Sequence, residues 1–126
     1  MIDGQPYACH MAISSNWMIH YVNAEMDQSA AKRAEEARFM EEFDTAFAAR
    51  HRGALAGIDR ALGLDYYAID CAETPAGDLL VFEADTAMLV HAMDPADLYP
   101  YKQPAMQKIF VASRAMLEKH RQGVRK

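Results

Sequence analysis

Residues 66–85, YYAIDCAETPAGDLLVFEAD, decide the fold of this 126-residue chain. Tyr66–Thr74 and Asp78–Asp85 are rich in aromatic and aliphatic side chains, and the intervening Pro75-Ala76-Gly77 is typical of a turn. This stretch therefore predicts an antiparallel β-hairpin.

Carboxylates gather on one face of the predicted hairpin. If residues 75–78 form the loop, Asp70 lies directly opposite Glu83. Asp85 projects to the same side, because strand side chains alternate between faces. We expect helices to cover the opposite, apolar face, which carries Ile69, Cys71, Leu80 and Phe82.

The facing carboxylates predict a cation site. Two like charges directly across a strand pair repel, so either one carboxyl holds a proton or a cation lies between them. Oxygen ligands favour Mg²⁺ or Mn²⁺ over zinc, and Mg²⁺ bound by few carboxylates completes its shell with water and substrate phosphates. We therefore predict a Mg²⁺–phosphate site at Asp70, Glu83 and Asp85. The alternative is that these acidic side chains are simply hydrated on an open strand face.

A second hairpin is expected near the N-terminus. Residues 7–14 and 17–23 are rich in aromatic and β-branched side chains, and Ser15-Asn16 between them is a plausible tight turn. Two hairpins give a four-stranded antiparallel sheet with helices on one face, an α+β fold. The other sheet face is then free to line a site.

Helical periodicity accounts for most of the remaining chain. Residues 28–50 predict one helix, which Gly53 interrupts. A shorter helix follows, with Leu55, Ile58 and Leu62 on one face and Gly63 as its C-terminal cap. Asp94-Pro95 predicts the start of a short helix, and the last helix is expected to begin near Pro104. The apolar stripe of the first helix consists of Phe39, Met40, Phe43 and Phe47, and the glutamates expected off this stripe are Glu35, Glu36, Glu41 and Glu42.

The spacing of the acidic residues is similar to that in a known superfamily. Glu83 lies thirteen residues after Asp70, and Asp85 lies two residues later. Residues 63–70 and 79–85 together resemble the C-terminal lobe of the ATP-grasp superfamily, particularly members resembling glutathione synthetase. In that lobe a helix ending in glycine leads into a strand with an acidic metal ligand, and a second strand ends in Glu-x-Asn. Position 85 departs from the pattern, because it is Asp where the family generally has Asn.

The resemblance implies a function. Asp70 and Glu83 would bind Mg²⁺, with Glu83 bridging two ions, and the protein would bind ATP and activate a carboxylate as an acyl phosphate. The first ATP-grasp lobe, with its strand lysine, glycine-rich loop and adenine-binding linker, is not recognisable in this sequence. We therefore expect the chain to be incomplete alone, as a homodimer or beside a separate chain that supplies the missing lobe. The alternatives are a catalytically inactive interaction or oligomerisation domain and a small Mg²⁺-dependent phosphohydrolase.

Other candidate site residues lie outside the second hairpin. His10 and His20 are candidate nucleotide contacts, because the resemblance places basic side chains in these strands; the competing interpretation is a histidine hydrogen-bonded at the sheet surface. Trp17 is interpreted as a core or interface residue. Lys102 is a candidate substrate contact only by its position in the chain.

Composition limits the class of partner. The net charge is −5, and no basic cluster precedes the tail at 119–126, which argues against nucleic-acid binding. The N-terminal residues lack the features of a signal peptide, and no apolar run approaches the roughly 20 residues that span a bilayer. We expect a cytoplasmic protein that binds neither nucleic acid nor membrane.

Overall fold

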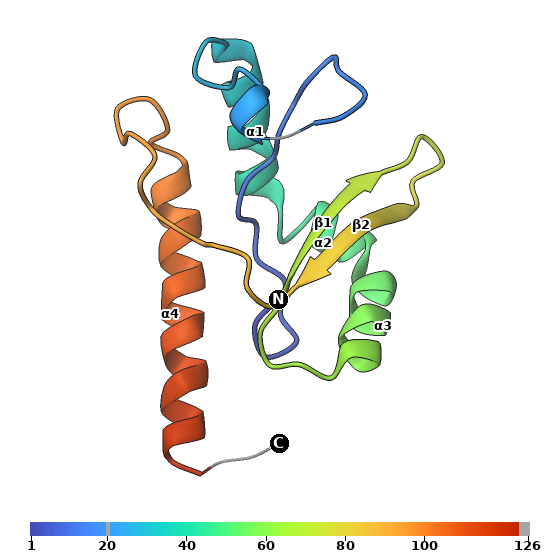
Figure 1. Ribbon diagram of the computed structural model, residues 1–126, viewed down its shortest axis with the longest axis vertical. Coiled ribbons are helices and arrows are strands. Elements are labelled where there is room, and N and C mark those ends of the chain that lie inside the picture. The colour runs from blue at the N-terminus through green and yellow to red at the C-terminus, as the bar shows by residue number, and fades with distance from the viewer. Residues whose placement is uncertain (20, 124–126) are drawn as a thin grey trace.

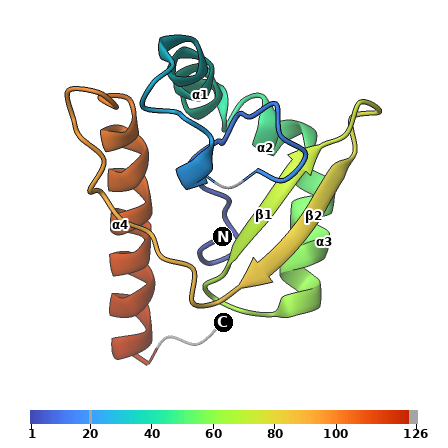
Figure 2. The ribbon, with the colours of Figure 1, turned by 45° about the horizontal axis from the view of Figure 1, so that its top comes forward.

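The computed structural model describes residues 1–19 and 21–123. In Figure 1, helix α4 stands on one side of the molecule and the β-hairpin on the other, with the N-terminal segment between them. Figure 2 shows α3 lying along one face of the hairpin. None of the helices in these residues is both long and apolar enough to cross a membrane. The elements in chain order are η1 (Tyr21–Asn23), α1 (Ala30–Glu42), α2 (Phe47–Arg50), α3 (Arg52–Leu62), β1 (Ala68–Glu73), β2 (Leu79–Asp85) and α4 (Lys102–Arg121).

The fold is α+β, but the predicted four-stranded sheet is wrong, because the described residues form one two-stranded antiparallel sheet. Residues 7–14 and 17–19 form no strand. Their backbone groups find other partners: the N–H of Met11 donates to Glu36 Oε1 at 3.0 Å. A side-chain acceptor thus replaces the backbone acceptor that a neighbouring strand would provide. The aromatic and aliphatic side chains of residues 7–14 pack against other elements instead of forming a sheet face.

The N-terminal residues join the hairpin to α4. Ile2 forms an isolated antiparallel bridge with Tyr66, just before β1. The Ile2 side chain is buried with Met106 and Ile109 of α4 in one core cluster. At the other end of α4, the Nζ of Lys119 lies 2.7 Å from Asp3 Oδ1.

The register of the hairpin confirms the predicted Asp70–Glu83 pair but differs from the prediction nearer the turn. Asp70 pairs with Glu83, as predicted. Nearer the turn, Leu79 pairs with Glu73, whereas the predicted loop of residues 75–78 would place it opposite Thr74. The two observations are compatible because the ladder is irregular beside Asp70, and Phe82 has no partner across the sheet. Such a β-bulge places an extra residue in one strand and shifts the register there by one.

The turn and the bulge change which residues share a face. The turn closes through Thr74, whose N–H donates to the Asp78 carbonyl at 2.9 Å. Gly77 has φ 86°, a conformation that glycine adopts without steric cost. Leu80 pairs with Ala72 and so falls on the carboxylate side of the sheet, not on the apolar side as predicted.

The helical region divides into three helices where one long and one short helix were predicted. Ser29 caps α1 by accepting a hydrogen bond from the backbone of Lys32 at 3.3 Å. Turns at residues 43–46 end α1 and separate it from α2. The predicted aromatic stripe is present, because the rings of Phe39, Phe43 and Phe47 contact one another with centroid distances of 5.5–5.6 Å.

The remaining helix boundaries largely follow the predictions. Gly63 ends α3 with φ 63°, and its N–H donates to the Asp59 carbonyl at 2.8 Å. Helix α4 begins at Lys102, two residues before the predicted start. The predicted short helix after Asp94 is wrong: Pro95 is followed by hydrogen-bonded turns that lead directly into α4.

Candidate functional site

The predicted carboxylate pair lies on the exposed hairpin. Asp70 and Glu83 are directly opposite each other, so their side chains share a face. Both are exposed, and neither side chain makes a hydrogen bond or an ion pair with residues 1–19 and 21–123. The two acidic side chains therefore share a face without a neutralising side chain among the described residues.

Asp85 has a different environment. It pairs with Ala68 at the start of β1, and its Oδ1 accepts a hydrogen bond from the Ala87 N–H at 2.9 Å. This contact ends the strand in a tight turn, which is a common structural use of Asp. Across the described ranges, no group of three or more His, Cys, Asp or Glu side chains is placed to hold a metal ion. The predicted triad is thus not assembled, although the Asp70–Glu83 pair is.

The chemistry of this pair fits a hard cation that keeps part of its hydration shell. Mg²⁺ is commonly bound through one or two carboxylates, with water and phosphate oxygens as the other ligands. Two exposed, unneutralised carboxylates provide that donor set. They do not provide the closed cage that a structural zinc ion requires.

His10 packs against a tyrosine whose ring also contacts the buried Lys102. Its ring contacts the ring of Tyr21 with a centroid distance of 4.7 Å. Desolvation and the positive charge of Lys102 lower the pKa of His10, while the negative charge of Asp70 acts in the opposite direction. The other predicted nucleotide contact, His20, lies outside the described residues.

A buried charged cluster, which we call the Glu36–Lys102 cluster, was not predicted. Glu36 is 0% and Lys102 is 3% exposed. The Lys102 Nζ lies 3.5 Å from Glu36 Oε1 and 3.0 Å from Asp94 Oδ2. Burying charges is costly unless they are paired and hydrogen-bonded, and these groups meet both conditions.

Two tyrosines complete the Glu36–Lys102 cluster. The hydroxyl of Tyr101 donates to Glu36 Oε2 at 2.7 Å, and Lys102 donates to the hydroxyl of Tyr21. Burial, and then the adjacent Glu36 carboxylate, raise the pKa of both tyrosines. The Lys102 Nζ also lies 4.2 Å and 4.7 Å from the ring centroids of Tyr21 and Tyr99, within cation–π range. The cluster therefore holds neutral hydroxyls around one cation.

The sequence did contain a signal for this cluster. Glu36 lies four residues before Met40, on the same face as the apolar stripe, so its assignment off the stripe was wrong. Lys102 likewise lies four and seven residues before the buried Met106 and Ile109. Because Lys102 is buried and fully engaged, the prediction of a direct substrate contact is also corrected. A charge at helical spacing within an apolar stripe is the pattern that identifies such a cluster.

Two cysteines and one histidine are the further polar side chains considered as site candidates. Cys9 and Cys71 are free and half-buried, and burial raises the pKa of both. His51 Nε2 lies 3.3 Å from Glu73 Oε2, and Arg50 approaches the same oxygen at 3.0 Å. These contacts fasten the end of β1 to the α2–α3 junction.

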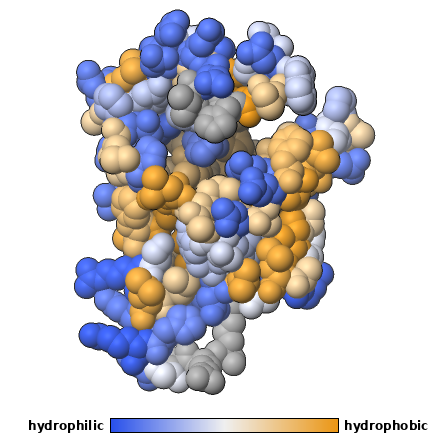
Figure 3. All heavy atoms as spheres, in the orientation of Figure 1, coloured by the Kyte–Doolittle hydropathy of each residue, from blue (hydrophilic) through white to orange (hydrophobic). Residues whose placement is uncertain are grey.

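Apolar side chains are also exposed over the hairpin. Leu80, Val81 and Phe82 of β2 are 47%, 37% and 67% exposed, and Figure 3 shows hydrophobic surface over this region. Trp17, interpreted from the sequence as a core or interface residue, is 93% exposed and so is not in the core. A contiguous run of exposed apolar side chains on a strand is typical of a surface that another chain covers.

Comparison of the chain with protein-family profiles, curated proteins and solved structures finds no match. The functional argument therefore depends on the side chains described above.

Proposed function

We propose that this chain supplies the metal-binding half of a Mg²⁺–ATP site like that of ATP-grasp ligases, and that a second lobe completes the site. The observation that supports the proposal is the direct pairing of Asp70 with Glu83 on the exposed hairpin. Like charges opposite each other on a strand pair cost free energy, and a divalent cation between them offsets that cost.

Each group has a defined role in this proposal. Asp70 and Glu83 each give a carboxylate oxygen to the cation and do not transfer protons. His10, whose ring packs against Tyr21, donates an N–H to an anionic phosphate oxygen. Bound Mg²⁺ would neutralise charge on the phosphoryl group that is transferred to a substrate carboxylate. Asp85 contributes negative charge at the strand end, since one of its oxygens is already engaged by Ala87.

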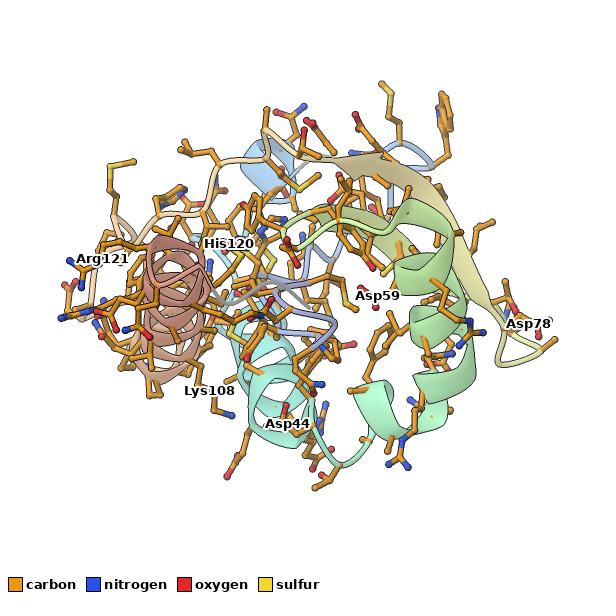
Figure 4. All side chains as sticks on the ribbon, turned by 90° about the horizontal axis from the view of Figure 1, so that it is seen from below. Asp44, Asp59, Asp78, Lys108, His120 and Arg121 are labelled. Carbon is orange, nitrogen blue, oxygen red and sulfur yellow. The ribbon has the colours of Figure 1, made fainter. Side chains whose placement is uncertain are left out.

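Binding of Mn²⁺ to the full chain tests the proposal. Mn²⁺ has the ligand preferences of Mg²⁺, and its paramagnetism enhances water-proton relaxation when it is bound. We expect the wild type to bind Mn²⁺ more tightly when ATP is present, and Glu83→Gln or Asp70→Asn to weaken this binding by about tenfold or more. Asp78→Asn is the matched control, because Asp78 lies in the turn at the far end of the same hairpin (Figure 4). Wild-type protein without ATP-dependent Mn²⁺ binding, or a Glu83→Gln variant equal to it, would refute the proposal.

The exposed apolar side chains of β2 favour a second candidate function, an interaction domain in which two copies of this chain cover each other's hairpins. An edge strand also presents unpaired backbone groups that another strand can bind. Sedimentation equilibrium should then give a dimer for the wild type and a monomer for Phe82→Lys. Val111→Lys, at an equally exposed apolar position on α4, is the control that should leave the dimer intact. A monomeric wild type would exclude this function.

A further inference from the structure

The Glu36–Lys102 cluster joins three separate parts of the chain. Glu36 belongs to α1 and Lys102 to the first turn of α4. Glu36 also accepts the backbone N–H of Met11, the residue after His10. The segment that carries His10 pairs with no strand in the described part of the chain, so this backbone hydrogen bond is an important tether for it.

The same cluster fixes the ring of His10. Tyr21, which accepts a hydrogen bond from Lys102, lies against the His10 imidazole with ring centroids 4.7 Å apart. His10 is therefore held on two sides: through its neighbour Met11 by Glu36, and through its ring by Tyr21. Neither Glu36 nor Lys102 is exposed, so they act on any ligand only through the groups they hold.

We propose that Glu36 and Lys102 are positioning residues whose buried ion pair holds His10 in place against Tyr21. This inference deepens the proposed function, because His10 is the group that would meet the phosphate end of the nucleotide. The cluster sets where His10 lies, and the hairpin sets where the cation lies. Loss of the cluster therefore releases His10 and leaves the hairpin, with its carboxylate pair, intact.

Two substitutions at position 36 separate positioning from simple electrostatics. Glu36→Leu removes both the charge and the acceptor for the Met11 N–H, whereas Glu36→Gln removes the charge and keeps an acceptor of the same shape. The groups whose charge acts on His10 are Lys102, which lowers its pKa, and Asp70, Glu36 and Asp94, which raise it. A pH titration of the His10 ring by NMR measures the pKa directly.

Glu36→Gln and Glu36→Leu are expected to shift the pKa of His10 in opposite directions. In Glu36→Gln, His10 stays in place and loses a favourable negative charge, so its pKa falls. In Glu36→Leu the segment is released into water, desolvation is relieved, and the pKa rises toward the ordinary value near 6.5. A fall of the His10 pKa in both variants would overturn the proposal, because loss of the Glu36 charge alone would then explain both results. Lys108→Met is the control: Lys108 is on the same helix but pairs at the surface with Asp44 at 2.9 Å (Figure 4), so its loss should not change the His10 pKa.

A second variant covers the case in which Glu36→Leu does not fold. The double variant Glu36→Leu/Lys102→Met removes both charges, an exchange that buried ion pairs often tolerate. Nuclear Overhauser effects between the rings of His10 and Tyr21 should be present in the wild type and absent in the double variant. Their retention would overturn the proposal.

Ligand binding separates this inference from the proposed function. None of the NMR measurements requires metal or nucleotide, so positioning of His10 is tested even if the wild type binds no ATP. Where the wild type does bind, we expect Glu36→Leu to weaken Mn²⁺-dependent ATP binding by about tenfold and Mn²⁺ binding alone much less. Equal loss of both would overturn the proposed division between His10 and the carboxylate pair.

Discussion

The substitution Lys102→Met should destabilise the protein by removing the only cation of the Glu36–Lys102 cluster as defined above. Methionine fills nearly the same volume but removes the ammonium group from a position that is 3% exposed. Breaking a buried ion pair by removing one partner costs about 3–5 kcal/mol. The Glu36 carboxylate keeps its hydrogen bonds from Tyr101 and Met11, so we expect a value near the lower end, about 3 kcal/mol.

Urea unfolding followed by far-ultraviolet circular dichroism measures this change in the free energy of unfolding. Fluorescence is unsuitable, because Trp17 is 93% exposed in the folded state and would change little. The dependence of the free energy on urea should keep its slope, so that a lower midpoint reports stability and not a change of compactness. Lys108→Met, which removes an exposed lysine from the same helix, should change stability by less than about 1 kcal/mol.

A double-mutant cycle with Glu36→Leu decides whether the two charges are coupled. The double variant should lose about 2 kcal/mol less than the sum of the two single losses, because the second substitution no longer strands a buried charge. A Lys102→Met loss below about 1 kcal/mol, or single losses that simply add, would refute the account of the cluster.

Three further predictions test the elements that surround the site. Gly63→Ala should cost about 1–2 kcal/mol, because Gly63 has φ 63° at the end of α3; Gly53→Ala, inside the same helix with open space at its Cβ, should not destabilise, and thermal denaturation compares the two. Ser29→Ala removes the cap of α1 and should cost about 1 kcal/mol in the same assay, whereas an unchanged midpoint would show that the cap contributes nothing. The close approach of His51 Nε2, 3.3 Å from the carboxylate, lowers the pKa of Glu73 below its ordinary 4.5, so the stabilisation is present above pH 4.5 and is lost as the pH falls through the folded-state value. Glu73→Gln should therefore reduce stability at neutral pH and not in strong acid, and an equal loss in both would contradict this linkage.

The second hairpin was predictable because its signal is local. Its turn residues, its strand composition and the facing of Asp70 and Glu83 all depend on neighbours in sequence. The prediction of an N-terminal hairpin was wrong because the partners of this segment are distant in sequence. Residues 7–14 have strand-like composition, but the acceptor for Met11 is a side chain on α1, 25 residues away in the chain. The aromatic and β-branched residues that are common in strands are those that fit a half-buried surface. A segment without a strand partner can provide such a surface by packing against helices.

The Glu36–Lys102 cluster was missed because charge was used to place residues on the solvent side. That rule fails where two opposite charges on different helices meet, and no single-helix pattern states which distant residue the partner is. Lys102 shows the difficulty: its helix spacing places it with Met106 and Ile109, yet nothing local names Glu36 as its counter-ion. Helical spacing indicates that each of the two positions is buried, whereas the pairing of Glu36 with Lys102 depends on how the helices pack together.

The bulge at Phe82 has a consequence for how this hairpin tolerates change. It lies between the turn and the Asp70–Glu83 pair, so the residues on its two sides do not share one continuous register. A one-residue insertion or deletion in the turn would ordinarily flip every side chain beyond it to the other face. Here, loss or displacement of the bulge can absorb such a change before it reaches the carboxylates. The length and sequence of the turn are thus free to diverge while the two acidic side chains stay opposite each other.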